Sequence, residues 1–288
     1  MNLRGKRAYA DTGFRWVAIV AASLVLLILG AIAVSMTARS WPVLGRMGLD
    51  FFTSRRWSPA DKLYGALPFI WGTLYTAAIA VAISVPISLG VAMFVTQIAP
   101  RKWRMPIIYV LDLLAVVPSV VFGLWGVMVL SQHFGLGRSF LTAGIILAVM
   151  ITPIITSLAR EVIETTPQNE KEAALALGAT KWEMIKGAVW PHSKGGLVGA
   201  VMLGLGRAMG ETIAVALVIG SSLGQITLHA LQPGNSMPAV IANEWGEADD
   251  LHKSALIALA VTLFVITIVV NLAANGIVQR SIKRSRGK

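Results

Sequence analysis

The sequence predicts an all-α, polytopic membrane protein with six transmembrane helices. Of its 288 residues, 56% are hydrophobic and only 14% are charged, and the mean hydropathy is +0.71. A soluble domain of this length does not have such a composition. Uncharged runs of about 20 residues, the length that crosses ~30 Å of hydrocarbon as a helix, recur six times. The backbone must satisfy its own hydrogen bonds among membrane lipids, so these runs are expected to be helices.

The six runs differ in the charges that bound or interrupt them. The first lies between Arg15 and Arg39. It is longer than the apolar part of a signal peptide, so we expect it to be retained as a span. The third is interrupted only by Asp112, and the fifth contains Arg207 and Glu211. The expected spans cover residues 16–36, a stretch within 63–100, and residues 106–130, 139–159, 195–220 and 254–279.

The distribution of Lys and Arg predicts the orientation in the plasma (inner) membrane. If the N-terminus is cytoplasmic, 17 of the 25 Lys and Arg residues fall in cytoplasmic segments, 7 fall outside, and Arg207 lies in the membrane. Cytoplasmic loops carry the excess of positive charge in membrane proteins. Both termini of this multi-pass chain are therefore predicted to be cytoplasmic. The net charge of +11 is then a topology signal, and no nucleic-acid partner is expected.

The sequence lacks the residue patterns that several kinds of chemistry require. Without Cys there can be no disulfide framework and no thiolate metal site. The four His are scattered, and neither His-Glu-x-x-His nor Gly-x-Ser-x-Gly occurs. We therefore predict no catalytic residues, no metal site and no cofactor in this chain. The phosphate-binding pattern Gly-x-x-x-x-Gly-Lys-[Ser/Thr] is missing too, so the chain alone is not expected to hydrolyse ATP.

The longest cytoplasmic connection is predicted at residues 161–194. Pro167 suits the first turn of a helix, and the following stretch "NEKEAALALGA" is rich in strong helix formers. Gly178 favours a sharp turn before a second short helix, "TKWEMIKGAVW", that ends at Pro191. The plain interpretation is an interfacial hairpin between two spans. The alternative is a docking surface for another protein.

The spacing in this connection resembles the signature of permease subunits of type I ABC importers. That signature is Glu-Ala-Ala, a Gly after three intervening residues, and an apolar residue with Pro about ten residues further on; Trp190 replaces its usual Leu. The stretches "EAALALGATKWEMI", "GLGRAMGETIAVALVIG", "DLLAVVPSVVFGLWG" and "IANEWGEA" resemble, more narrowly, phosphate importer permeases of the PstC type. The residues that match the signature are Glu172, Ala173, Ala174, Gly178, Ala179, Val189 and Pro191.

The resemblance implies an ABC transporter type-1 (MetI-like) core in residues 67–280. A cytoplasmic N-terminus with the first span (1–36) and an outer loop (37–66) would precede it, and a basic tail (281–288) would follow. It also implies that this transport subunit is not an enzyme. Its implied partners are a second, PstA-type permease that completes a heterodimer, a PstB-type ATPase dimer that binds ATP and Mg, and a PstS-type phosphate-binding protein. The ATPase would couple through Glu172, Ala173, Ala174, Gly178 and Ala179.

Arg207 and Glu211 are two opposite charges inside a predicted span. At ~1.5 Å per residue, Arg207 lies about 18 Å along the helix and Glu211 about 6 Å further. A lone charge at such depth costs about 2.5–3.5 kcal/mol, so we expect neither to face lipid. Their i, i+4 spacing allows a buried salt bridge that only fixes packing. Alternatively, Arg207 binds a passing phosphate and Glu211 holds Arg207 in place. The resemblance places both in the importer's charged pair and favours this pathway.

Glycines and a third charge accompany the pair. Gly195 with Gly199, and Gly206 with Gly210, have the small-xxx-small spacing that lets a neighbouring helix approach, here expected from the second permease. Asp112 lies about 9 Å into its span. We expect it to be a buried acid that anchors a helix end or contacts a gate, because it would repel phosphate.

Other functions stay open at this stage. The chain could be the PstA-type partner or serve another oxyanion, since Arg binds sulfate or molybdate equally well. More remotely, it could be a secondary anion transporter, although such a protein has no use for the Glu-Ala-Ala segment and commonly shows internal repeats. A non-transporting membrane scaffold, in which the charged pair is purely structural, is the last alternative.

Overall fold

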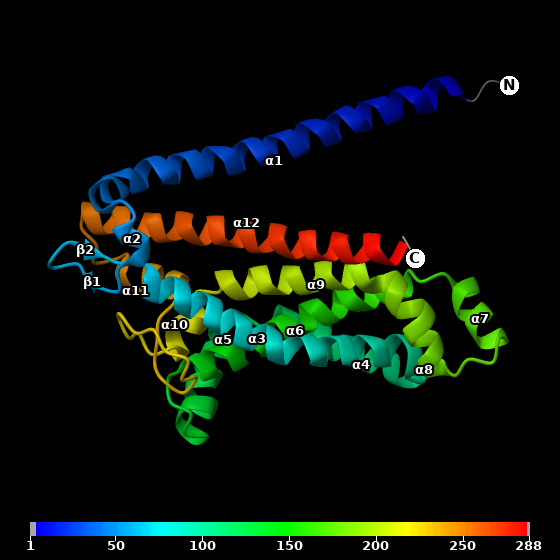
Figure 1. The fold of residues 1–288 in the computed structure, drawn as a ribbon. Helices are drawn as coiled ribbons and strands as arrows, with labels where there is room; N and C mark the ends of the chain where they lie inside the picture. Colours follow the sequence, from blue (N-terminus) through cyan, green and yellow to red (C-terminus); the bar gives the residue numbers. More distant parts are fainter. Residues whose placement is uncertain (1–3, 287–288) are drawn as a thin grey trace.

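The computed structural model describes the backbone of residues 4–286 and the side-chain environments of residues 13–274. It is mostly helical, as predicted (Figure 1). The long helices are α1 (Arg4–Met47), α3 (Leu67–Met93), α6 (Phe140–Glu164), α9 (Trp190–Gly210) and α12 (Asp250–Arg286). The shorter helices are α2 (Asp50–Thr53), α4 (Arg101–Val116), α5 (Ser119–Trp125), α7 (Gln168–Ala176), α8 (Lys181–Met184), α10 (Ile213–Val218) and α11 (Met237–Glu244), with π-helical segments η1 (Phe94–Ile98), η2 (Gly126–His133) and η3 (Ile185–Val189).

Not every predicted span is one straight helix. Within residues 4–286, the segments that are long and apolar enough to cross a membrane are Gly13–Met47, Leu67–Ile98, Phe140–Glu164 and Asp250–Ala274. The predicted third span is sharply bent at Pro118, where Arg101–Val116 and Ser119–His133 meet at 93°. Pro118 explains the bend: it is extended, as is the residue before it, and proline disfavours helical backbone at that preceding position.

The centre of the bundle is formed by α3, α6 and α9. α3 packs along α6, and α9 packs against both α6 and α12. Ile151 and Ile155 of α6 and Met209 at the end of α9 are buried in this core. Pro153 lies within α6 and is itself buried, which neighbouring helices tolerate.

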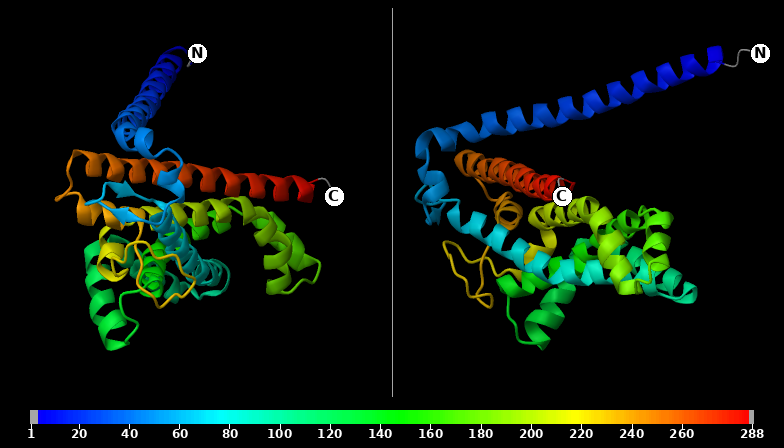
Figure 2. Two further views of the ribbon diagram at one scale, coloured as in Figure 1. Left: turned by 60° about the vertical axis from the view of Figure 1, so that its left-hand side comes forward. Right: turned by 45° about the vertical axis from the view of Figure 1, so that its right-hand side comes forward.

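α1 stands apart from this bundle. It contacts α12 and leans away from the other helices toward its start in all three views (Figures 1 and 2). The apolar side chains of its predicted span are exposed within this chain. α1 also continues through Met47, so the predicted outer loop of residues 37–66 begins as helix.

The two ends of the bundle are built from different elements. At one end, which we call the hairpin end, α2 and α11 lie beside a two-stranded antiparallel sheet of β1 (Trp57–Ser58) and β2 (Leu63–Tyr64), in which Trp57 pairs with Tyr64. At the opposite end, the linker end, α7 and α8 protrude from the bundle (Figure 1). The first turn of α1 and the last turn of α12 lie toward the linker end as well.

Candidate functional site

The predicted fifth span is broken where its charges lie. α9 starts at Trp190 but ends at Gly210, and Glu211 then takes extended backbone angles (φ −69°, ψ 128°) before α10 begins at Ile213. The expectation of one continuous helix over residues 195–220 is therefore wrong. Six glycines and two basic residues lie in α9, and glycine is a poor helix former. Broken helices place backbone and polar side chains at mid-membrane binding sites in transporters.

The predicted contact between Arg207 and Glu211 is not formed. Among the described residues, no ion pair joins these two side chains. The Glu211 carboxylate instead accepts a hydrogen bond from the Ala214 backbone N–H, 3.4 Å away, at the first turn of α10. The helix break separates their roles: Arg207 belongs to the end of α9, and Glu211 caps the next helix.

Arg207 and Asp112 are also less enclosed than expected. Within this chain Arg207 and Asp112 are exposed, and Glu211 is half-buried. Asp112 lies on α4, a helix with no buried residue among those described. A charge on a membrane span needs water, a partner charge or another protein around it. The predicted burial of Arg207 and Asp112 is therefore wrong for the single chain, and both side chains require an environment that this chain alone does not supply.

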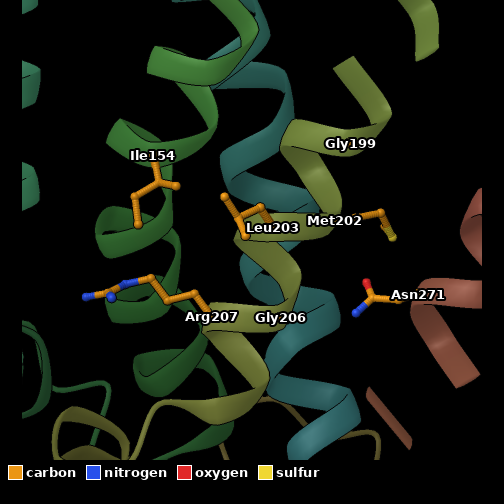
Figure 3. Close-up of a pocket in the computed structure, with 7 residues that line it drawn as sticks. All are labelled: Ile154, Gly199, Met202, Leu203, Gly206, Arg207 and Asn271. Carbon is orange, nitrogen blue, oxygen red and sulfur yellow. The ribbon is translucent and has the colours of Figure 1, made fainter. Parts of the chain in front are cut away.

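Arg207 lines a cavity of about 710 Å³ on the open face of α9. Figure 3 shows Arg207 leaving α9 past Ile154 of α6, while Asn271 of α12 points toward Gly206 from the other side. Of the described lining residues, Arg207 alone is charged and Asn271 is the only other one with a polar side chain. The remaining lining residues are Ile154, Gly199, Met202, Leu203 and Gly206. The cavity thus offers a cation on a largely apolar, glycine-rich floor.

The glycines of α9 divide its surface into two faces. A Cβ at Gly204 would lie 2.5 Å from an Ile155 side-chain carbon, and one at Gly196 would lie 2.5 Å from Val162. These two glycines, which the spacing argument missed, make the close approach to α6. Gly199, Gly206 and Gly210 have no neighbour within 4 Å of such a Cβ, and Gly195 is half-buried. The predicted packing role of Gly199, Gly206 and Gly210 is therefore not fulfilled inside this chain.

The Glu-Ala-Ala segment forms the protruding part of the linker end. Glu172, Ala173 and Ala174 lie on α7, and the chain turns at Gly178, whose φ of +84° suits glycine. Ala179 donates its backbone N–H to the carbonyl of Ala174 across this turn. The predicted loop is shorter than 161–194, because α6 runs to Glu164 and α9 begins at Trp190.

The second short helix of this segment begins with a capping box. The Thr180 hydroxyl accepts the Glu183 backbone N–H, and the Glu183 carboxylate accepts the Thr180 backbone N–H at 2.8 Å. The hydrogen bonds that the Thr180 backbone N–H and hydroxyl donate to this carboxylate lower the pKa of the Glu183 carboxyl. Leu177, at the corner between the helices, is 90% exposed, and Trp182 is exposed beside it. An exposed apolar corner on a well-formed turn is typical of a protein contact surface.

Sequence reasoning missed a polar cluster at the hairpin end. Trp57 Nε1 donates to Glu244 Oε2 at 2.9 Å, and His252 Nε2 lies 2.8 Å from the same oxygen. Tyr64 stacks on His252 and is fully buried; burial first, then Asp249 and Glu244, raise the pKa of its phenol. The positions of these residues in the sequence carry no signal for this cluster, because its partners lie almost 190 residues apart.

No metal centre accompanies these sites. Over the part of the chain that the structure describes, no group of three or more His, Cys, Asp or Glu side chains is arranged to hold a metal ion.

Comparisons with known proteins point in one direction. A family model described as "Binding-protein-dependent transport system inner membrane component" matches residues 84–284. The phosphate transport system permease protein PstC of Xylella fastidiosa is 41% identical over 293 residues, which cover 93% of this chain and 90% of the relative. The PstC protein of Haemophilus influenzae is 38% identical, with 98% of this chain and 97% of the relative covered.

A solved structure shares the fold. A chain of a bacterial alginate ABC transporter, determined in complex with an alginate pentasaccharide-bound periplasmic protein, superposes with a TM-score of 0.65. The match covers 96% of this chain and 99% of that chain at 14% identity. At this low identity the likeness concerns the fold alone.

Proposed function

The chain belongs to the family of binding-protein-dependent transport system inner membrane components, and from this we propose that it is the permease subunit of an ATP-driven importer for inorganic phosphate. Relatives named as phosphate transport system permease proteins, at 41% and 38% identity over most of both chains, support phosphate as the substrate. They also support the PstC type over the PstA type.

The observation that carries this proposal is the cavity at Arg207. A guanidinium has five N–H donors in a fixed fork that fits a tetrahedral oxyanion. Here it is the one charge among the described residues of a 710 Å³ cavity with an apolar floor. An apolar floor holds an anion weakly, and weak binding is what transfer across a membrane requires. Arg207 therefore attracts phosphate into the path without trapping it.

Glu211 has a different role from the one that its sequence position suggested. Its carboxylate caps α10 through the Ala214 amide and so fixes the helix break at the end of the cavity. It is a positioning residue for the path. Arg207 alone supplies the charge that meets the anion.

The open face of α9 supports a partner permease. Arg207 is exposed, and Gly199, Gly206 and Gly210 have free space around them. Small residues let a second transmembrane helix approach closely. A second permease, of the PstA type by the resemblance, then closes the cavity from the other side, and the two subunits share one path as a heterodimer.

The linker end supports coupling to a separate ATPase. Glu172, Ala173, Ala174, Gly178 and Ala179 lie on the α7 segment and its turn, next to the exposed Leu177. We infer that an ATPase dimer, which binds ATP and Mg, seats on this segment and moves it. The hairpin end faces outward and receives a phosphate-loaded binding protein. Both termini are then cytoplasmic, and the chain spans the inner membrane with lipids around it.

Transport then follows alternating access. Docking of the loaded binding protein at the hairpin end and closure of the ATPase dimer at the linker end reorient the helices around Arg207. Hydrolysis takes place in the ATPase, and this chain supplies half of the path.

The test is ATP-dependent uptake of labelled phosphate by the complete complex in vesicles. We expect Arg207→Gln to assemble normally and to lose uptake by at least about 100-fold, because removing a charged hydrogen-bond partner costs about 3 kcal/mol. Arg138→Gln, at an exposed position outside the cavity, is the matched control and should transport normally. Normal uptake by Arg207→Gln, or equal uptake of sulfate by the wild type, contradicts the proposal.

A further inference from the structure

We propose that Asn271 is a second contact for the permeating anion and a determinant of selectivity for phosphate over sulfate. This inference rests on the proposed function. It concerns a residue on a different helix from Arg207 and a chemical property, hydrogen-bond acceptance, that an arginine does not have.

Asn271 is an unusual residue for its position. It lies in the membrane-spanning part of α12, in the run "VITIVVNLAA", and it is half-buried, whereas Val269 and Leu272 beside it are exposed. A polar side chain in such a span is costly unless it has a hydrogen-bond partner. Among the described residues, none forms a hydrogen bond with its side-chain amide. We therefore expect the hydrogen-bond partner of the Asn271 amide to lie in the cavity.

The geometry directs this amide into the same cavity as Arg207. Figure 3 shows the Asn271 amide pointing toward Gly206, on the side of α9 opposite to the Arg207 side chain. Gly199 and Gly206 add no side chain to the cavity, whose other α9 lining residues are Met202 and Leu203. A volume of about 710 Å³ far exceeds the ~30 Å³ share of one water molecule. A partly hydrated oxyanion thus has room to move between Arg207 and Asn271.

The chemistry of the two residues is complementary. Arginine only donates hydrogen bonds, while an asparagine amide donates through its NH₂ and accepts through its carbonyl oxygen. Phosphate near neutral pH carries at least one proton on oxygen, and sulfate carries none. A bound phosphate with no acceptor for this proton leaves a donor unpaired, which costs about 1–3 kcal/mol. The Asn271 carbonyl supplies an uncharged acceptor, so it favours phosphate without repelling it as a carboxylate would.

The test compares three variants in the complete complex. Asn271→Leu removes both hydrogen-bonding functions at similar size, and Asn271→Gln retains them on a longer stem. Thr267→Val is the matched control, because the Thr267 hydroxyl, one turn earlier on α12, already donates to the Leu263 carbonyl at 2.8 Å. The measurements are the KM and the maximal rate of phosphate uptake, and the inhibition constant for sulfate.

We expect Asn271→Leu to raise the KM for phosphate about tenfold and to lower the preference over sulfate by a similar factor. Asn271→Gln should restore part of both, and Thr267→Val should change neither. Unchanged KM and sulfate inhibition in Asn271→Leu overturn the inference. A lower yield of assembled complex with unchanged selectivity per complex also overturns it, because Asn271 would then serve only the contact with the second permease.

A second readout does not depend on transport. The natural chain has no Cys, so Asn271→Cys introduces a unique thiol into this subunit. A charged thiol reagent should label it from water, and phosphate should slow the labelling more than sulfate does. Leu272→Cys, at the next position and 66% exposed but outside the cavity, should be labelled slowly in lipid. Equal labelling at the two positions, insensitive to phosphate, contradicts the inference.

The two proposals fail in distinguishable ways. If the wild type takes up no phosphate, or if Arg207→Gln transports normally, the proposed function is wrong. If Arg207→Gln loses uptake while Asn271→Leu keeps the wild-type KM and selectivity, only the role of Asn271 is wrong.

Discussion

The hairpin end and the linker end of this molecule are stabilised in opposite ways. At the hairpin end, side chains join residues that are far apart in the sequence: Trp57 with Glu244, Thr73 with Met237, and Ser254 with the Arg39 carbonyl. At the linker end, described side-chain hydrogen bonds of α7 and α8 are local, as between Gln168 and Glu172 and between Thr180 and Glu183.

The difference shows which end of the molecule covers its apolar side chains with the chain's own residues. The hairpin end buries its aromatic side chains against one another and is closed by its own residues. The linker end forms its turn locally and leaves Leu177 and Trp182 uncovered. An end that forms its turn locally and is apolar on its surface is suited to bind another protein, and Met184 of α8, buried in one cluster with Ala159 and Ile163 of α6, ties it to the bundle. Matched substitutions at the two ends test this comparison.

The largest effect is expected from Trp57→Ala at the hairpin end. Trp57 is 5% exposed, contacts Tyr64 and Phe69 edge-on, and donates to Glu244. Truncating a buried Trp costs about 3–5 kcal/mol, so the thermal unfolding midpoint of the purified protein in lipid nanodiscs should fall strongly.

Trp182→Ala at the linker end is the control for this substitution. Trp182 is 61% exposed, and its described aromatic interaction is with the Lys186 ammonium, 4.9 Å from the ring centroid. Such exposed contacts contribute about 0.5–1 kcal/mol. Similar losses of stability in both Trp variants would show that the two ends do not differ in the way described.

Leu177→Asp should separate folding from assembly at the linker end. The side chain is 90% exposed, so the unfolding midpoint should change little. The affinity for the proposed ATPase partner should fall about tenfold, because a charge would replace an apolar contact that the proposed complex buries. Co-purification and a binding titration with the ATPase measure this. If Leu177→Asp binds the ATPase with the same affinity as the wild type, Leu177 is not part of the contact with the ATPase.

The smallest effect at neutral pH is expected from Tyr64→Phe. The Tyr64 hydroxyl is buried with no hydrogen-bond partner among the described residues, so removing it should change stability by about 1 kcal/mol or less. The pKa of Tyr64 is raised, chiefly by burial. The unfolded chain therefore loses this proton first, near pH 10, and the free energy of unfolding falls as pH rises from there through the raised pKa. Tyr64→Phe should show a shallower decline in unfolding scans across this range; identical declines would contradict this.

Much of the fold could be predicted because the hydropathy of a segment indicates whether its helix lies in lipid or in water. The first, second, fourth and sixth runs fall on helices long enough to span a membrane. The Glu-Ala-Ala segment was predicted as two short helices with a corner at Gly178, and α7, α8 and the φ of +84° confirm it. Capping, glycine and helix propensity act over a few residues, so sequence is sufficient to predict them.

The residues predicted for the site stay a prediction, and the contact predicted between Arg207 and Glu211 is not formed. Arg207 stands out in the sequence because a charge in an apolar run is costly. Whether it pairs with Glu211 depends on where α9 ends, and α9 ends at Gly210, directly before Glu211. Asn271 escaped notice because a single amide costs less in a span than a charge and has no fixed spacing to Arg207.

The sequence by itself determined the membrane environment, the approximate positions of the helices, the linker turn and the presence of Arg207 in an apolar run. Each of these follows from local composition and from the free energy of placing a side chain in hydrocarbon. Only the tertiary structure decided which glycines pack and that Arg207 and Asn271 line one cavity. These features join segments of different helices that are far apart along the chain, and such contacts depend on how helices of fixed shape fit together rather than on any local pattern.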